Sequence, residues 1–290
     1  MVASSKARQG PSEEPISAMA YQGICDLIQK HSSIKLGDNK QSMLTSRLKG
    51  RMQQLGLRSW EEYFRYVSQA ANNSEIHTLI DLVAINHTQF FRERQHFDRL
   101  GSELLDRILS DCPGASKQLL AWSAACSTGE EAFSLAITIS EHLAKKTGPK
   151  PEWLVYASDI SRKAIQVAAT AIYQEASLNL PKAEFLQRYF KRGSAIYASK
   201  CRVKSEILDH VKIERMNLFQ ESYPLPAQPH LIFCRNVLIY FAQDSQAKLV
   251  SRLHRLLAPG GILIIGHCDS LACFPHDFQS LGGGVFRKSP

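Results

Sequence analysis

Short apolar runs alternate with segments of helical spacing from residue 118 to the end of the chain, and this alternation limits the possible folds more than any other feature. Brief apolar runs bounded by polar residues are typical of strands that are buried on both faces. They occupy Gln118–Trp122, Trp153–Ala157, His230–Cys234 and Ile262–Ile265, with a last strand predicted at Val285–Lys288; Val211–Met216 instead alternates between apolar and charged residues, as a strand also does. Segments of helical spacing separate them at Glu130–His142, Arg162–Ala171 and Gln246–Leu257. This order predicts an α/β fold, a doubly wound and mostly parallel sheet with helices on both faces.

The rest of the chain divides into segments of different character. Residues 1–15 contain few large apolar groups and are predicted to be a disordered tail. Apolar residues at helical spacing over 16–84 predict a small all-helical domain, and 85–96 is a polar and aromatic segment between domains. Residues 97–290 then form the α/β domain. Within it, about 177–210 is too long for a simple crossover and is predicted to be a small inserted antiparallel β subdomain.

Composition and charge exclude several classes of protein. No apolar run is long enough to span a bilayer and the N-terminus has no segment of signal-peptide type, so we expect a cytoplasmic protein without membrane insertion. Seven cysteines without a CxxC pair fit reduced thiols, and no metal-ligand spacing is present, so no metal site is predicted. The net charge of +8 favours an acidic partner, whether nucleic acid, a membrane surface or an acidic protein.

Polar side chains stand at the carboxyl ends of four predicted strands, where ligands of doubly wound sheets bind. These residues are Ser127-Thr128-Gly129 with Glu131, then Asp159, then Asn217, then Arg235-Asn236. Asp159 suits a hydrogen bond from a ribose hydroxyl, and it equally suits the N-cap of a helix beginning near Ser161. The GxGxxG fingerprint is absent, so S-adenosyl-L-methionine is favoured over NAD as the cofactor.

Five stretches of the chain carry a family resemblance. They are Asn86-His-Thr-Gln-Phe-Phe-Arg-Glu93, Trp122-Ser-Ala-Ala-Cys-Ser-Thr-Gly-Glu-Glu131, Ala157-Ser-Asp159, Ile232-Phe-Cys-Arg-Asn-Val-Leu-Ile-Tyr-Phe241 and Gly266-His267. In this order and spacing they resemble the CheR family of chemotaxis-receptor glutamate methyltransferases. The resemblance covers nearly the whole chain after the tail. It implies a small all-α domain followed by a class I, Rossmann-like methyltransferase domain.

The resemblance also implies roles for individual residues. The matched cofactor contacts are Asn86, Thr88, Arg92, Gly129, Glu131, Asp159, Asn217, Leu218, Asn236 and Val237. Arg92 and Tyr240 match the catalytic pair near the transferred methyl. Arg47 and Arg51, on the basic second helix of the small domain, match positions that dock the receptor, although a solvated helix face would explain the same charges. Cys126 stands where relatives have a small residue, which predicts intact binding but sensitivity to thiol reagents.

The implied reaction transfers a methyl group to glutamate side chains of methyl-accepting chemotaxis receptors. Its products are glutamate methyl esters and S-adenosylhomocysteine. A glutamate carboxylate is already ionised near pH 7, so the reaction needs positioning rather than a general base. The inserted subdomain matches the region by which some relatives grip a receptor C-terminal peptide. Residues 193–199 lack the glycine-rich loop of that region, so use of such a peptide stays open.

Two alternatives remain at this point. The first is a nucleic-acid methyltransferase, which the positive charge favours; against it, the fourth strand ends in Arg235-Asn-Val-Leu-Ile-Tyr240 instead of an Asn-Pro-Pro-Tyr motif. We therefore expect no nucleic-acid partner. The second is a non-catalytic signalling module that binds S-adenosylmethionine, and the presence of all the matched site residues argues against it.

Overall fold

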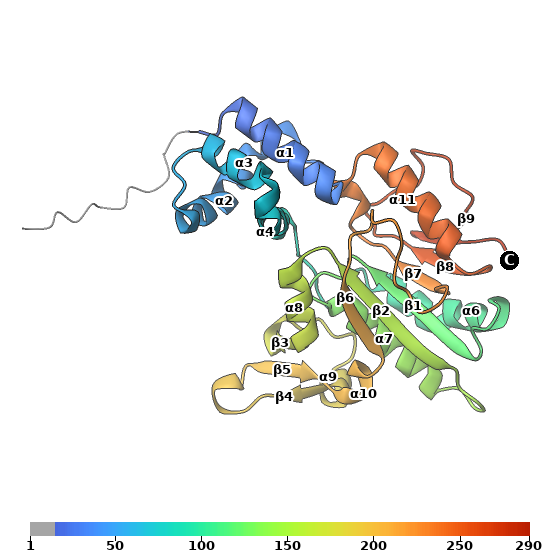
Figure 1. Cartoon of the computed structure of the whole chain (residues 1–290). Coiled ribbons are helices and arrows are strands. Elements are labelled where there is room, and N and C mark those ends of the chain that lie inside the picture. Colours follow the sequence, from blue (N-terminus) through green and yellow to red (C-terminus); the bar gives the residue numbers. More distant parts are fainter. Residues whose placement is uncertain (1–14) are drawn as a thin grey trace, which may run out of the picture. The chain divides into compact units, whose positions relative to one another are not determined.

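Figure 1 shows the computed structural model of the chain, which describes residues 15–290 apart from the side chains at positions 38, 70 and 73. Apart from Pro15, the predicted tail of residues 1–15 lies outside the described residues. The chain divides into two compact units, residues 1–84 and residues 85–290.

Four α-helices form most of the described part of the first unit. They are α1 (Ala18–Ser32), α2 (Gln41–Leu55), α3 (Trp60–Ser68) and α4 (Asn73–Val83). Their apolar faces meet in a core that includes Ile24 and Leu48, both without exposed surface. α2 ends at Gly56, whose φ of 71° favours glycine, and α3 begins with a capping box between Ser59 and Glu62. The prediction of an all-helical N-terminal domain is confirmed.

A seven-stranded sheet is the centre of the second unit, in the order β6-β2-β1-β7-β8-β10-β9. The strands are β1 (Gln118–Ala124), β2 (Glu152–Asp159), β6 (Val211–Arg215), β7 (Leu231–Phe233), β8 (Ile262–Ile264), β9 (Gln279–Gly282) and β10 (Val285–Arg287). The five neighbouring strands β6, β2, β1, β7 and β8 are parallel, whereas β10 pairs antiparallel with both β8 and β9. The predicted doubly wound, mostly parallel sheet is confirmed.

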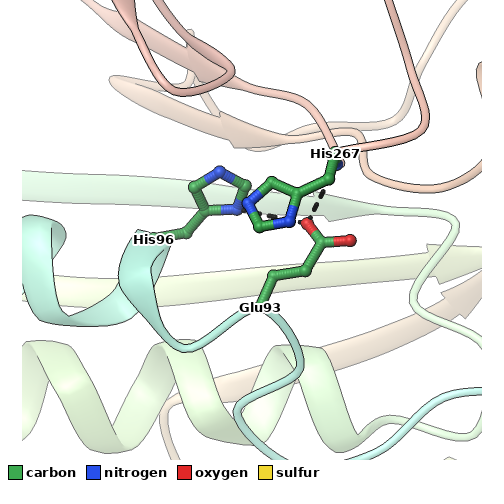
Figure 2. A group of neighbouring side chains, drawn as sticks. All are labelled: Glu93, His96 and His267. Atoms are coloured by element: carbon green, nitrogen blue, oxygen red, sulfur yellow. Dashed lines mark hydrogen bonds and ion pairs between the residues drawn. The ribbon is translucent and has the colours of Figure 1, made fainter.

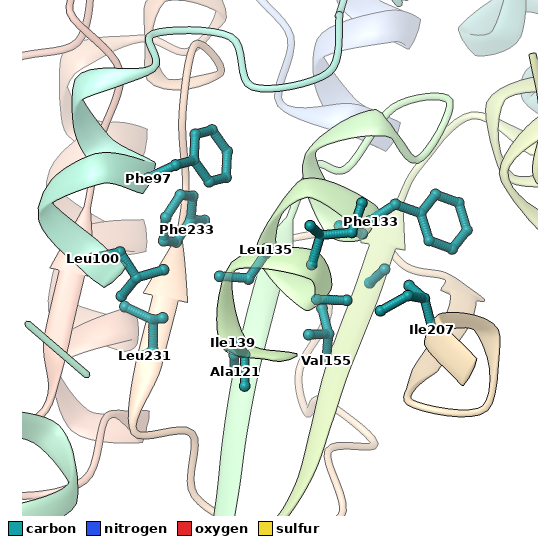
Figure 3. Close-up of a cluster of buried hydrophobic side chains, with 14 of the residues drawn as sticks. Phe97, Leu100, Ala121, Phe133, Leu135, Ile139, Val155, Ile207, Leu231 and Phe233 are labelled. Atoms are coloured by element: carbon teal, nitrogen blue, oxygen red, sulfur yellow. The ribbon is translucent and has the colours of Figure 1, made fainter. Parts of the chain in front are cut away.

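Both faces of this sheet are buried. Ala121, Val155 and Phe233 point to one face, where α7 (Glu130–Ala144) and the helical stretch of residues 95–111 pack against them (Figure 3). That stretch consists of α5 (Gln95–Arg99), a π-helical segment (Leu100–Leu104) and α6 (Leu105–Asp111). Trp122 points to the opposite face and contacts Tyr223, with ring centroids 5.1 Å apart.

α11 (Gln243–Leu256) helps to cover the opposite face. Its Arg252 side chain donates to the Gln220 carbonyl oxygen at 2.6 Å, and its guanidinium lies over the Tyr223 ring. The segment that follows β6 is therefore held in place by the helix that follows β7. No helix within residues 15–290 is long and apolar enough to cross a membrane.

A second, three-stranded antiparallel sheet is inserted after α8 (Arg162–Thr170), in the order β3-β5-β4. It comprises β3 (Ile172–Gln174), β4 (Phe190–Arg192) and β5 (Lys200–Val203), with α9 (Glu184–Tyr189) and α10 (Ser205–Leu208) beside them in sequence. The predicted antiparallel subdomain is confirmed. Its first strand precedes the expected start near 177, because three residues directly after a helix are too few to show strand periodicity.

Candidate active site

The parallel strands bring their carboxyl ends to one edge of the sheet. Ala124 of β1 pairs with Ser158 of β2, and Ser123 of β1 pairs with Phe233 of β7. Asp159, the last residue of β2, pairs with Arg215, the last residue of β6. The polar residues that follow these strands therefore meet at the edge where ligands of this fold bind.

The turn between β1 and α7 has an unusual backbone. Ala125, Ser127 and Gly129 all have positive φ, with values of 69°, 51° and 98°. A Cβ atom on Gly129 would lie 2.9 Å from both the Ala168 Cβ and the Tyr173 hydroxyl oxygen. Position 129 thus requires glycine for two reasons: the positive φ, and the close contact with Ala168 and Tyr173. No side chain among the described residues caps α7, which leaves its first N–H groups available to a polar ligand.

Asp159 joins this turn to the end of β2. Its Oδ2 accepts a hydrogen bond from the Ser127 N–H and its Oδ1 accepts one from the Ser161 N–H, both at 2.9 Å. The side chain of Ser161, not that of Asp159, is the N-cap of α8, where it accepts from the Ala164 N–H. Ser161 is thus the N-cap residue, and the Asp159 carboxylate two residues earlier holds the turn after β1 against the start of α8.

The segment of residues 85–94 is anchored by two buried aromatic rings. Phe90 packs edge-on against Tyr173, and the Phe91 N–H donates to the Ser134 Oγ at 2.9 Å. Its polar side faces the strand ends: the Ser127 hydroxyl donates to the Asn86 carbonyl oxygen at 3.1 Å, and the Asn86 Nδ2 lies 3.4 Å from the Ser161 Oγ. Asn86, from before the sheet in sequence, thus lies beside the ends of β1 and β2.

Arg92 and Tyr240 are both half-buried. The Arg92 guanidinium donates to the His87 carbonyl oxygen at 3.0 Å. Burial raises the pKa of the Tyr240 hydroxyl, and the positive charge of Arg92 opposes that shift. The structure therefore brings the two residues of the expected catalytic pair within electrostatic reach of each other.

Glu93 is a connecting residue that the sequence did not single out. Its carboxylate accepts from the Asn236 Nδ2 at 2.9 Å, the His267 N–H at 3.1 Å and the Arg235 guanidinium at 3.2 Å. Figure 2 shows its carboxylate beside the His267 ring, with dashed lines that join it to His96 and to the His267 backbone. Burial alone would raise the pKa of Glu93, but the bond from Asn236 and the charge of Arg235 outweigh it and lower that pKa.

Glu131 lies on the other side of the same arginine. Its Oε2 is 3.6 Å from the Arg235 NH1, and its Oε1 accepts from the Ser123 hydroxyl at 2.8 Å. Burial raises the pKa of the Glu131 carboxyl, while Arg235 and Ser123 act in the opposite direction. Arg235, only 5% exposed, thus connects the ends of β1 and β7 with the segment that contains Glu93.

Asp269 is a second residue that sequence reasoning missed. It follows β8, and its carboxylate accepts from the N–H groups of Asn236 and Gly266. A Cβ atom on Gly266 would lie 2.4 Å from the Asn236 Nδ2, so the two loops touch without space for a side chain. Its position after a parallel strand was the signal that could have identified it.

The remaining expected cofactor contacts lie around this cluster. Leu218 is buried, and Thr88, Asn217 and Val237 are half-buried. The Asn217 Oδ1 accepts from the Phe219 N–H at 2.9 Å, which shapes the turn after β6. β6 and β7 flank the central pair of strands, so these residues border the cluster on both sides.

Cys126 is buried in the turn, and burial followed by the charges of Asp159 and Glu131 raises its thiol pKa well above the usual value. Such a thiol is a poor nucleophile, so the expected sensitivity to thiol reagents is not supported at this residue. Cys268 and Cys273 are the exposed cysteines among the described residues.

Arg47 and Arg51 belong to the first unit and both have partners within it. Arg47 donates to the carbonyl oxygens of Leu82, Val83 and Ala84 at 2.9–3.1 Å, and so closes the end of α4. Arg51 forms an ion pair with the buried Glu75 at 2.6 Å.

Known proteins resemble the chain over nearly its whole length. The family model of the CheR methyltransferase SAM-binding domain matches residues 86–286, and that of the CheR methyltransferase all-alpha domain matches residues 19–84. The chemotaxis protein methyltransferase of Salmonella typhimurium is 34% identical over 274 residues, which cover 94% of this chain and 91% of that protein. The Escherichia coli protein is 33% identical, covering 94% and 92% of the two chains. Chemotaxis protein methyltransferase 2 of Pseudomonas aeruginosa is 32% identical, covering 93% and 92%.

Proposed function

The chain belongs to the CheR family of chemotaxis protein methyltransferases, which use S-adenosylmethionine, and on this premise we propose that the cluster of strand ends is its cofactor and methyl-transfer site. One junction carries the proposal: the Ser127 hydroxyl binds the Asn86 carbonyl while the Ser127 N–H binds Asp159. It brings the segment before the sheet to the ends of β1 and β2.

The polar groups of this cluster fit the chemistry of the cofactor. S-adenosylmethionine has ribose hydroxyls that need acceptors and a methionine part with an ammonium and a carboxylate group. We assign Asp159 to the ribose and Glu131 to a second acidic contact, with the open N–H groups of α7 facing the ligand. Asn86, Thr88, Gly129, Asn217, Leu218, Asn236 and Val237 complete the proposed contacts.

The bound cofactor supplies a methyl group activated by a positively charged sulfur. The receptor glutamate is ionised near pH 7, so the protein's task is to hold one carboxylate oxygen in line with that methyl. Arg92 orients the carboxylate through a charge-assisted hydrogen bond. Burial keeps the Tyr240 hydroxyl protonated, so that it can donate a second bond to the substrate.

The receptor should dock on the small unit. We propose that the basic α2 binds the glutamate-rich cytoplasmic helices of a chemotaxis receptor, and that Arg47 and Arg51 belong to this docking surface. Because these receptor helices are cytoplasmic, the protein would act in the cytoplasm. Both arginines also stabilise their own unit, so charge reversal at either would confuse docking with unfolding. Arg47→Gln and Arg51→Gln remove the charge without reversing it, and a thermal melt of each variant reports any unfolding. Lys49→Glu is the matched control, because Lys49 is exposed about half a turn away on the same helix. The arginine variants should raise the KM for receptor more than Lys49→Glu does and leave cofactor affinity unchanged; equal loss of both would contradict docking on α2.

A receptor C-terminal peptide would use the inserted sheet. We propose that such a peptide, where the receptor has one, pairs with an edge strand, next to the exposed Ile196 and Tyr197. Removing the C-terminal residues from the receptor should then raise its KM for the wild-type enzyme. Unchanged kinetics would rule out this contact.

The experiment that tests the reaction uses labelled S-adenosylmethionine and membranes that contain the organism's own receptors. Transfer to glutamate gives a methyl ester, which mild base releases as methanol. Base-stable label would indicate methylation at nitrogen and would contradict the proposed product. Cofactor binding without any transfer would favour a non-catalytic module.

A further inference from the structure

Glu93, His96 and His267 form a cluster that the proposed methyl transfer does not use (Figure 2). One potential ligand atom from each residue lies within 4.8 Å of the other two. Glu93 lies two residues before α5 and His96 lies in the first turn of α5, whereas His267 follows β8. The sequence predicted no metal site, because the third of these residues is far from the first two along the chain.

Within the described part of the chain, His96 has a buried nitrogen atom without a hydrogen-bond partner. The ring is 2% exposed, and its Nε2 lies 2.8 Å from the Gly283 carbonyl oxygen. A carbonyl oxygen only accepts, so the Nε2 carries the proton and donates it. In the neutral ring the Nδ1 presents a lone pair, has no hydrogen-bond partner among residues 15–290, and lies 3.5 Å from the Glu93 Oε2. Two acceptors this close in a buried position repel each other unless a proton or a metal cation lies between them, and the Arg235 and His267 N–H donors to Glu93 leave the Nδ1 itself unsatisfied.

We propose that Glu93, His96 and His267 bind a divalent transition-metal ion of the zinc type. Imidazole nitrogens and carboxylate oxygens are common zinc ligands. A histidine that binds zinc usually donates its other ring N–H to a backbone carbonyl, as His96 does to Gly283. The Glu93 carboxylate is likewise held in position, because it accepts hydrogen bonds from the Asn236 side chain and from the His267 N–H.

The distances agree with tetrahedral binding on the buried side. Zinc bonds of about 2.0–2.2 Å place neighbouring ligand atoms about 3.3 Å apart. The 3.5 Å between the His96 Nδ1 and the Glu93 Oε2 is close to this value. The exposed His267 ring can rotate to complete the site, and water would take the fourth position, since three protein ligands leave one open.

Arg235 limits the strength of the site. Its NH2 lies 3.2 Å from the Glu93 Oε2 and repels a nearby cation, although Glu131 on its other side offsets part of that charge. We therefore expect reversible binding, so that a chelator removes the ion without unfolding the protein. A structural zinc ion, by contrast, would be needed for folding.

The test is a titration of the full, untagged chain with Co²⁺ after treatment with a chelator. Cys268→Ser and Cys273→Ser form the background, because exposed thiolates also bind such metals. We expect visible absorption that saturates at one ion per chain, is displaced by Zn²⁺, and accompanies a rise in melting temperature. His267→Ala and His96→Gln should each weaken Co²⁺ binding at least about tenfold. Loss of a residue that only supports a metal ligand already weakens binding by about this factor, and loss of a ligand itself should cost no less.

A matched control is His254→Ala, because His254 lies on α11 outside the cluster. It should keep the parental affinity. His267→Ala removes an exposed side chain, so the metal-free variant should melt like the parent and report on binding alone. Absence of binding by the parent, or unchanged affinity in both cluster variants, would overturn the proposal.

Discussion

Arg92 is the residue on which the proposed chemistry depends most. Its guanidinium is half-buried near Tyr240, and hydrogen bonds to charged groups contribute about 1.5–3 kcal/mol. We expect Arg92→Ala to lower kcat by roughly 10- to 100-fold, since about 1.4 kcal/mol corresponds to a factor of ten. The fold should persist, because the His87 carbonyl is the one acceptor of the Arg92 side chain within the described part of the protein. The measurement is the rate of ester formation on receptor membranes, with a thermal melt as the control. Near-normal turnover would exclude the assigned role.

The sequence predicted the positions of the site residues better than their partners. Asp159 and Asn236 could be placed at the site because parallel strands end at one edge. Glu93 could not, since its importance comes from Arg235, Asn236 and His267, which are distant in sequence. Neither could the partners of Arg51, because only the packed bundle shows that Glu75 is buried beside it.

The turn between β1 and α7 is the central element of the proposed cofactor site. An alanine at 129 would adopt a left-handed conformation, which costs about 1–2 kcal/mol, and its Cβ would press on Ala168 and Tyr173, which costs a further 1–3 kcal/mol or so. We expect Gly129→Ala to lower the free energy of unfolding by about the sum of these two costs, as measured by denaturant titration. It should also weaken cofactor binding, as measured by calorimetry.

Gly50→Ala is the matched control. Gly50 lies within α2, and a Cβ atom added there would meet no described atom within 4 Å beyond its chain neighbours and the backbone of its own helix, so the same substitution should stabilise the helix by about 0.5–1 kcal/mol. If both variants were equally stable, the argument from backbone and packing at Gly129 would be wrong.

The strand β7 is coupled to pH through His230, which precedes it. The ring Nδ1 accepts from the Leu120 N–H at 3.1 Å, and burial lowers the His230 pKa from its usual value of about 6.5. The unfolded chain therefore takes up a proton more readily than the folded one. Stability is complete above about pH 6.5 and falls as the pH drops toward the lowered pKa.

Replacing His230 with glutamine tests this coupling. His230→Gln retains an acceptor for Leu120 but does not titrate, so its free energy of unfolding should change less between pH 7.5 and pH 5 in denaturant titrations. The slope should not vanish, because His31 and His254 also have lowered pKa values. A slope equal to that of the parent would show that His230 contributes nothing to it.

Element boundaries were predictable where a residue type marks them. α7 begins at Glu130 directly after the glycine turn, as expected, and α11 ends just before the Pro259–Gly261 stop signal. α11 begins at Gln243, earlier than the predicted Gln246; no side chain of residues 15–290 caps it, so the sequence contains no capping signal that marks its start. The three-residue strand β3 was missed because periodicity needs a longer run.

For the whole molecule, the net charge of +8 predicts a salt dependence. Attraction between a basic enzyme and an acidic receptor is screened over about 10 Å at 0.1 M salt. The KM for receptor should rise several-fold between 50 and about 500 mM NaCl, while cofactor affinity, which depends on partly buried groups, should change little. Initial rates and calorimetry measure the two quantities. A KM that does not respond to salt would argue against electrostatic docking.

The hairpin of β9 and β10 has a consequence for the order in which the molecule is completed. Gly282 and Gly283 offer their carbonyl oxygens to Arg99 and His96, which precede them by 183 and 187 residues. During synthesis, the two side chains of α5 therefore wait for their partners until nearly all of the α/β unit has left the ribosome. A chain that ends before the hairpin would carry every proposed methyl-transfer residue and the buried Phe97, but α5 would lack these two hydrogen bonds.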